Sequence, residues 1–297
     1  EHRFNSFTTT FSGLTGSAGM AWNFNPNFYT KANLSFGFRA PNIAELGANG
    51  VHEGTIRYEI GNTQLKAEKS RQVDLSLGFN TDHVSIEIDG FINSIDNFIF
   101  LSKLSTSGGT DSLRDGNSVF LYSSGNALLK GGEILIDLHP HPFDWLHFEN
   151  SLSIVDAQQK DQPDSTKYLP FTPPMKVTSE LKFTAKKLSK VISNSYFKIG
   201  IDYYFEQDKI YSAFNTETST PGYNLFHAGI GTDVTIKKKK LLSAYINVTN
   251  LGDVAYQSHL SRLKYAPENP VTGQTGIFNM GRNINFKVIV PLEFSKK

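Results

Sequence analysis

Residues 280–292 have the sequence MGRNINFKVIVPL, in which apolar and polar side chains alternate. From Met280 to Leu292 every even position except Arg282 is apolar, whereas most odd positions are not. A period of two is typical of a β-strand with one apolar and one polar face. The 13 residues of this stretch exceed the usual globular strand of about 5–6 residues and suffice for a bilayer crossing of roughly 9–11 residues. The pattern therefore predicts a membrane-spanning strand.

The same alternation recurs upstream and predicts an antiparallel sheet of about eleven strands. We place these strands at 13–24, 28–38, 68–80, 84–102, 118–138, 143–156, 171–186, 192–210, 223–236, 241–249 and 278–294. Tight turns follow the odd-numbered strands, and long segments follow the even-numbered ones, at 39–67, 103–117, 157–170, 211–222 and 250–277. This asymmetry is typical of an all-β, transmembrane β-barrel of the outer membrane, with periplasmic turns and extracellular loops. A soluble sandwich also alternates, but its strands are shorter.

The composition excludes several classes of protein. The 29 basic and 28 acidic side chains give a net charge of +1, which argues against a nucleic-acid partner and against an acidic disordered tail. The absence of cysteine excludes disulfides, thiolate metal sites and cysteine nucleophiles. The mean hydropathy is −0.30, and no apolar run approaches the ~18 residues of a membrane-spanning helix.

Aromatic residues and the two strand faces fit a lipid environment. The chain has 23 Phe, 12 Tyr and 2 Trp, several of them near expected strand ends, as at Trp22, Phe24 and Phe28. Such residues form belts at the two membrane interfaces. In lipid the apolar face points outward, and the polar face lines a wet or plugged lumen. We therefore expect His147 and His227, which fall on polar faces, to point toward the lumen.

Several ordered stretches resemble TonB-dependent outer-membrane receptors. The central barrel region of that family looks like FRAPNIAEL (38–46), YEIGN (58–62) and LKAEKS (65–70). NVTNLGD (247–253) is similar to the penultimate-strand motif of the family, and the strand that closes on Phe294 resembles its terminal assembly signal. Ser295, Lys296 and Lys297 follow the aromatic residue at which the family usually stops, and they could be native or added.

The resemblance implies a fold, a function and partners. Barrels of this kind have about 22 strands, so we expect residues 1–297 to be the C-terminal portion, without the plug domain and the first barrel strands. The implied function is active import of a scarce ligand, such as a metal chelate, siderophore or haem, through the outer membrane of a Gram-negative bacterium. The implied partners are the TonB-ExbB-ExbD energy-coupling complex, the plug and N-terminal barrel half of the same protein, and outer-membrane lipid and lipopolysaccharide.

The segment 39–67 holds the candidate ligand-binding residues. These are His52, Glu53, Arg57, Tyr58 and Glu59. An imidazole beside carboxylates offers ligands for zinc, copper or iron, and His alone ligates haem iron. In haem-importing members of the family a His lies between FRAP and NPNL motifs, and here His52 lies between FRAP (38–41) and the degraded motif NTQL (62–65). His52 is therefore the candidate metal ligand, and a structural loop histidine is the alternative.

The remaining candidates have simpler explanations. His139-Pro140-His141 could bind metal, but two prolines near it favour a rigid periplasmic turn. Lys237 to Lys240 is best explained as a solvated turn. A His-Glu-x-x-His motif fails because position 56 is Ile, and no Ser-His-Asp set can be placed, so we expect no enzyme and no cofactor. A passive porin-like channel, or a receptor for a saccharide or vitamin, stays open as the alternative to metal import.

Overall fold

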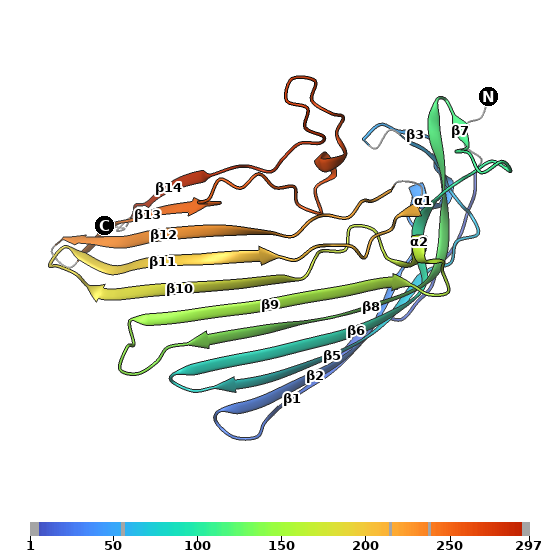
Figure 1. Ribbon diagram of the computed structural model, residues 1–297. Coiled ribbons are helices and arrows are strands. Elements are labelled where there is room, and N and C mark those ends of the chain that lie inside the picture. Colours follow the sequence, from blue (N-terminus) through green and yellow to red (C-terminus); the bar gives the residue numbers. More distant parts are fainter. Residues whose placement is uncertain (1–5, 55–56, 214–215, 237–238, 293–297) are drawn as a thin grey trace, which may run out of the picture.

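The computed structural model describes residues 6–54, 57–213, 216–236 and 239–292. It is one curved sheet with three small helices near one end (Figure 1). The helices are α1 (Ile43–Gly47), α2 (Asp164–Lys167) and the 3-10 helix η2 (Arg262–Tyr265). The strands are β1 (Gly16–Asn23), β2 (Phe28–Arg39), β3 (Asn49–His52), β4 (Arg57–Ile60), β5 (Glu68–Asn80), β6 (Val84–Lys103), β7 (Leu113–Arg114), β8 (Asn117–Leu138), β9 (Leu146–Gln159), β10 (Lys176–Lys187), β11 (Ile192–Tyr204), β12 (Tyr223–Ile236), β13 (Lys239–Thr249) and β14 (Asn283–Ile289).

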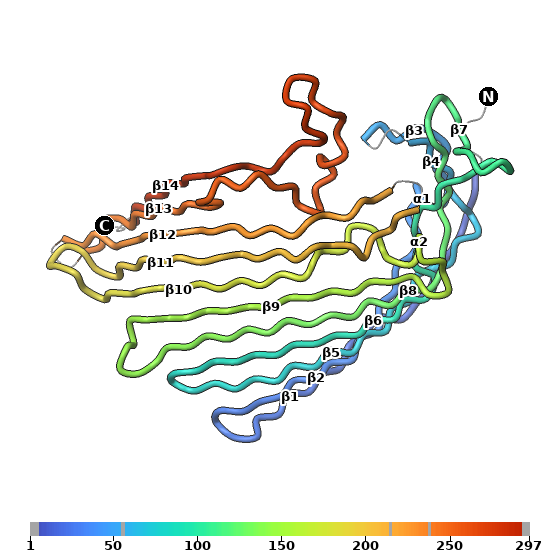
Figure 2. Tube along the Cα trace, viewed as in Figure 1, coloured from blue at the N-terminus to red at the C-terminus, as the bar shows by residue number. Residues whose placement is uncertain are grey.

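Eleven of these strands pair with their neighbours in chain order. The order is β1-β2-β5-β6-β8-β9-β10-β11-β12-β13-β14, and each neighbouring pair is antiparallel. β3 pairs with β4, β4 runs parallel to β8, and β7 pairs with β8. The short connections gather at one end of the sheet, and the long segments gather at the other (Figure 2). The expected all-β, antiparallel arrangement with alternating connections is confirmed.

The last strand is shorter than its alternation predicts. β14 begins at Asn283 rather than at 278, because the residues before it bond to the preceding loop. The amide of Asn279 donates to Tyr256 O (2.9 Å), and the amide of Arg282 donates to a carboxylate oxygen of Asp253 (2.8 Å). Alternation alone therefore overestimated the strand, which ends at Ile289 in the described part.

Other strands also differ from their expected bounds at the long-loop end, most of all β10 and β11. β10 begins at Lys176 rather than 171, and β11 ends at Tyr204 rather than 210. Residues 171–175 and 205–210 lie outside the strands, and Phe171 and Lys209 make hydrogen bonds within the loops instead.

Some expected features lie outside the described residues. These are Lys237 and Lys238 of the lysine turn, and 293–297, which include Phe294, Ser295, Lys296 and Lys297.

Apolar and polar side chains form separate rows across neighbouring strands. One apolar row, from β9 to β14, consists of Phe148, Leu181, Ile199, Ala228, Val248 and Ile284. The row one residue away consists of His147, Lys182, Lys198, Gly229, Asn247 and Asn285. Because successive side chains point to opposite sides of a strand, these rows lie on opposite faces of the sheet.

The polar face is the more crowded of the two. Along β5 the side chains of Val73, Leu75 and Leu77 are about half exposed, whereas the polar residues between them are partly buried. Curvature brings side chains together on the concave side of a sheet, so the polar rows occupy that side. His147 and His227 lie in polar rows, as expected, and His227 Nε2 is 3.2 Å from Glu180 Oε2.

The apolar face carries no protein covering within the described residues. Its side chains are exposed along most strands, and the fully buried apolar residues form only two small clusters. A chain of aromatic rings crosses the short-turn end of this face, from Phe143 to Trp145 and on to Phe183 and Phe197 (5.8, 5.9 and 6.2 Å between centroids). Among the described residues, no helix has the length and apolarity needed to cross a membrane.

We predict that Ile284→Arg in the full-length protein lowers the free energy of unfolding by about 2–4 kcal/mol, because it places a cation in the hydrocarbon region. Val288 lies on the same face of β14 as Ile284, so Val288→Arg should have a similar effect. Asn285→Arg is the matched control on the polar face and should cost much less. Denaturant titration of the protein folded in lipid vesicles measures these losses, and equal losses on the two faces would contradict the assignment.

Candidate functional site

Arg39, the last residue of β2, fastens the long segment 40–67 to the sheet. Its Nη1 donates to both oxygens of Glu45 (2.9 and 3.0 Å), while Nε and Nη2 donate to the two oxygens of Glu68 (2.7 and 2.6 Å). Bidentate arginine–carboxylate pairs are among the strongest polar contacts in proteins. Glu68 Oε1 also accepts the amide of Ile99 (2.8 Å). The FRAP motif therefore acts here as a clamp that joins β2, β5 and β6.

The helix α1 continues this clamp. Asn42 Oδ1 accepts the amide of Glu45 (2.9 Å), and Glu45 Oε2 accepts the amide of Asn42 (2.7 Å), which is a capping box. The backbone at Gly61 then lies against the end of the helix, and its amide donates to Ala48 O (2.7 Å). A Cβ on Gly61 would lie 2.4–2.5 Å from backbone atoms of the helix end. Only glycine allows this approach.

β3 and β4 form a hairpin that packs onto the extension of β8 beyond β9. β4 runs parallel to β8, with Tyr58 opposite Val119. Tyr58 is only 2% exposed, and its hydroxyl donates to Asn49 Oδ1 (2.7 Å). The guanidinium of Arg114 lies over the Tyr58 ring, 4.7 Å from its centroid. Tyr58 therefore holds the hairpin in place from within.

Glu59 occupies the other buried position of β4. Its side chain accepts hydrogen bonds from Arg57 Nε (2.8 Å) and from the hydroxyl of Tyr122 (2.9 Å). The guanidinium of Arg57 also lies over the ring of Phe120 (5.3 Å). Arg57, Tyr58 and Glu59 thus belong to one packed network.

His52 and Glu53 lie at the outer end of the same hairpin, and both are exposed. His52 pairs with Arg57 in the strand register, and Glu53 enters the turn directly after it. The structure therefore divides the five predicted residues into two groups. Arg57, Tyr58 and Glu59 make contacts within the protein, whereas the side chains of His52 and Glu53 are exposed.

A second buried network joins three other long segments. Glu217 Oε1 lies 3.0 Å from His259 Nε2, and both side chains are almost fully buried. Glu217 also accepts the amides of Phe171 (2.6 Å) and Tyr211 (3.0 Å). Burial alone would raise the pKa of Glu217, but the hydrogen bonds from His259 and from these two amides hold it below its ordinary value. The carboxylate is therefore ionised at neutral pH and ties the segments together.

Lys264 of η2 extends this network toward a cavity. Its Nζ donates to Thr218 O and to Thr220 Oγ1 (both 2.8 Å), and Thr220 Oγ1 lies 2.8 Å from His259 Nδ1. Thr220 and Lys264 also line a cavity of about 300 Å³, together with Tyr223 and Tyr256. The rings of Tyr204 and Tyr223 stack with their centroids 4.6 Å apart, and the ring of Tyr256 lies tilted against Tyr223 at 4.7 Å. Aromatic rings therefore line part of the cavity, and Lys264 Nζ is already bonded within the network.

Sequence reasoning missed Glu217, His259 and Lys264. They come from two segments that were expected only to be loops, and no spacing rule connects them. Their contact depends on how those segments fold over the end of the sheet, so no signal in a single sequence identifies the pair.

The amino-acid sequence matches the profile of a known protein family. The profile of the family described as TonB dependent receptor-like, beta-barrel matches residues 2–251. The chain belongs to this family. The match confirms the resemblance carried by residues 38–46, 58–62 and 65–70. Members of the family are transporters and receptors.

Solved structures of TonB-dependent receptors share the fold. The copper transporter OprC is 18% identical, with a TM-score of 0.70 over 92% of this chain and 39% of that one. The FrpB iron transporter from Neisseria meningitidis is 15% identical, with a TM-score of 0.63 over 93% and 39%. A mutant of the ferric enterobactin receptor PfeA from Pseudomonas aeruginosa is 18% identical, with a TM-score of 0.59 over 92% and 39%. The chain therefore spans 39% of the length of each of these receptors.

We predict that Gly61→Ala loosens the hairpin, because the new methyl group overlaps backbone atoms of the α1 end. Such overpacking costs about 1–3 kcal/mol, which should appear as faster hydrogen exchange of amides 57–60. Gly54→Ala is the control in the same hairpin, since its Cβ would meet only the flexible His52 ring, at 3.3 Å. Unchanged exchange in Gly61→Ala would contradict the close packing.

We also predict that the stability of the loop around Glu217 depends on pH. Because the pKa of Glu217 is lowered, its stabilising effect is present above the ordinary value of 4.5 and is lost as the pH falls below it. Hydrogen exchange of amides 211–220, corrected for the intrinsic pH dependence, should accelerate in that range. In the Glu217→Gln variant these amides should exchange rapidly already at pH 7, and their exchange should lose this pH dependence. Glu206 is exposed, and in the Glu206→Gln variant the amides should exchange as in the wild type.

Proposed function

We propose that this receptor barrel imports a scarce ligand by TonB-dependent transport through the outer membrane of a Gram-negative bacterium. The observation that carries the proposal is the division of the sheet into two ends: short turns at one, and long segments held by networks of paired charges at the other. Ordered loops above a polar concave face provide a rigid place to capture a ligand before it enters the lumen. The TonB-ExbB-ExbD complex would supply the energy, and no enzymatic step is needed.

We propose a metal-containing ligand, such as a metal chelate, siderophore or haem. His52 and Glu53 are both exposed and adjacent in the sequence, and they offer a nitrogen and an oxygen donor of the kinds that suit a transition metal or its complex. The structural neighbours named as copper, iron and ferric enterobactin proteins support this class of ligand. In this proposal His52 and Glu53 contact the ligand, whereas Arg57, Tyr58 and Glu59 position the hairpin that carries them.

We further propose that residues 1–297 form the C-terminal portion of a larger barrel. The support is the share of the related receptors that the chain covers, 39%. In hydrocarbon a sheet must close so that no strand edge is left unpaired. The remaining barrel strands and a plug would complete the lumen, and lipid with lipopolysaccharide would surround the apolar face.

The first test of this function is uptake by the full-length protein. A Gram-negative strain that lacks its own metal receptors, grown under metal limitation, should recover with one member of a panel of ferric siderophores, haem, copper and zinc. Growth should depend on TonB. Equal uptake with and without TonB would instead support a passive channel, and recovery only with a saccharide or vitamin would contradict the ligand class.

The second test concerns the hairpin. We predict that His52→Ala and Glu53→Gln each weaken binding of the identified ligand by about 10–100-fold, which is the loss expected for a contact to a charged group. Glu268→Gln, an exposed carboxylate in another long segment, is the matched control and should bind as wild type. Titration of purified receptor with the ligand measures these constants. Wild-type affinity in both hairpin variants would show that the ligand binds elsewhere.

A further inference from the structure

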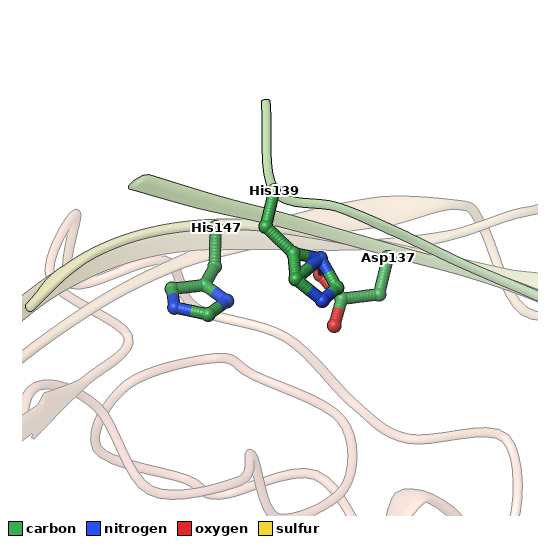
Figure 3. Close-up of side chains that lie close together, drawn as sticks. All are labelled: Asp137, His139 and His147. Atoms are coloured by element: carbon green, nitrogen blue, oxygen red, sulfur yellow. Dashed lines mark ion pairs between the residues drawn. The ribbon is translucent and has the colours of Figure 1, made fainter. Parts of the chain in front are cut away.

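Histidines gather at the end of the sheet opposite to His52. Four of the eight histidines of the chain, His83, His139, His141 and His147, lie in or beside two neighbouring short turns. Among the described residues, one group combines three side chains that can ligate a metal, with ligand atoms within 4.8 Å of one another. It consists of Asp137 near the end of β8, His139 in the following turn, and His147 in β9 (Figure 3).

The strand register brings these three residues together. Asp137 pairs with Glu149 and Leu138 with Phe148 at the end of β8, so His139, the first residue after the strand, comes close to His147. Asp137 lies two residues before His139 and therefore on the same face of the sheet. The rings of His139 and His147 have centroids 5.2 Å apart. This face is the polar one, since His147 lies in the polar row with Lys182.

The backbone around the group is well supported. The amide of His139 donates to His83 O (2.8 Å), which joins the turn to the neighbouring one. Within the turn, Phe143 N donates to Pro140 O and Leu146 N donates to Phe143 O (both 2.7 Å). The strand that presents His147 and the turn that presents His139 are therefore held in a fixed relation, as preorganised metal ligands require.

Two ligand atoms of the group make no hydrogen bond. Asp137 Oδ1 and His139 Nδ1 are buried atoms, and neither has a hydrogen-bond partner among the described residues. They lie 3.5 Å apart, within ion-pair distance of each other, and the side chains of His139 and Asp137 are 28% and 36% exposed. Buried polar atoms are almost always satisfied, and Lys182, the cation beside His147 in the register, instead has its Nζ 3.9 Å from Glu149. A cation between Asp137 and His139 would satisfy both atoms at once.

The separation of these atoms fits a transition metal. Zinc binds imidazole nitrogen and carboxylate oxygen at about 2.0–2.2 Å, which places two ligands of a tetrahedral ion roughly 3.4 Å apart. The observed 3.5 Å between Asp137 Oδ1 and His139 Nδ1 is close to that separation. Three protein ligands leave the fourth position to water. Imidazole and carboxylate donors suit Zn²⁺, Cu²⁺ and Ni²⁺.

We propose that Asp137, His139 and His147 bind one divalent transition-metal ion on the polar face at the short-turn rim. The site is independent of the import function, because it lies at the end of the sheet opposite to the long segments and does not involve His52. His141 and Asp144 lie in the same turn, with His141 Nδ1 3.5 Å from Asp144 Oδ1, but both side chains are about two-thirds exposed or more. They provide an internal comparison.

Metal binding by the purified full-length receptor tests the proposal, with Zn²⁺ alone as the probe. After treatment with a chelator, the wild-type protein in detergent should bind Zn²⁺ at this site in a calorimetric titration, and Co²⁺ should give the visible absorption of a tetrahedral complex. His139→Asn with His147→Asn should weaken Zn²⁺ binding by at least about 10-fold and abolish the Co²⁺ spectrum. Asp137→Asn, which keeps the shape of the side chain, should also weaken binding.

The matched control is His83→Asn with His141→Asn, which removes two histidines from the same rim and should leave Zn²⁺ affinity unchanged. Heat-modifiable migration on gels verifies that each variant has assembled, and Asp137→Asn provides the test should the double variant fail to assemble. Absence of Zn²⁺ binding in the wild type, unchanged affinity in Asp137→Asn and in the His139/His147 variant, or an equal loss in the control would overturn the proposal. A loss in His52→Ala alone would place the metal at the hairpin instead.

Discussion

The whole fold depends on the requirement that a sheet surrounded by hydrocarbon bond every backbone N–H and C=O internally and present apolar side chains outward. Between β1 and β14 the antiparallel ladder meets the first condition, although the outer edges of these two strands need further barrel strands to meet it. Rows such as Phe148 to Ile284 meet the second condition. Because the side-chain period is two, the position of the apolar row also determines the polar row one residue away. A slip by a single residue would exchange the two faces, so the register specifies both the lipid contact and the lining of the lumen.

Beyond the end of the ladder a different interaction holds the chain. The long segments bury few apolar side chains and rely instead on paired charges, which are buried in Glu217 with His259 and partly exposed in Arg39 with Glu45 and Glu68. Such pairs add little net stability compared with apolar packing, but a carboxylate with several directed donors accepts only one arrangement of its neighbours. The geometry of the long-segment end therefore depends on directional contacts, whereas the geometry of the barrel wall depends on periodicity.

This difference explains which parts of the structure could be predicted from sequence. Alternation is a local signal, so the eleven strands and the two faces followed from it. The end of β14 did not, because alternation continues past the residues that find a partner on β13. Within the segment 39–67 the candidate residues could be located, but not divided into buried and exposed groups, since Glu59 is buried only because Tyr122 and Arg57 meet it. The contact of Glu217 with His259 is wholly tertiary and had no sequence signal.

A histidine lies beside a carboxylate at both ends of the sheet, but the two pairs differ in spacing and in exposure. Thr220 Oγ1 lies 2.8 Å from His259 Nδ1 and Glu217 Oε1 lies 3.0 Å from His259 Nε2, and both His259 and Glu217 are almost fully buried, so this imidazole meets only the protein and holds loops. At the short-turn rim, His139 Nδ1 and Asp137 Oδ1 are 3.5 Å apart, which is close to the spacing around a shared ion, and both side chains are partly exposed. Spacing and access from outside are thus the physical difference between a histidine that fastens a loop and one that is set to coordinate a metal.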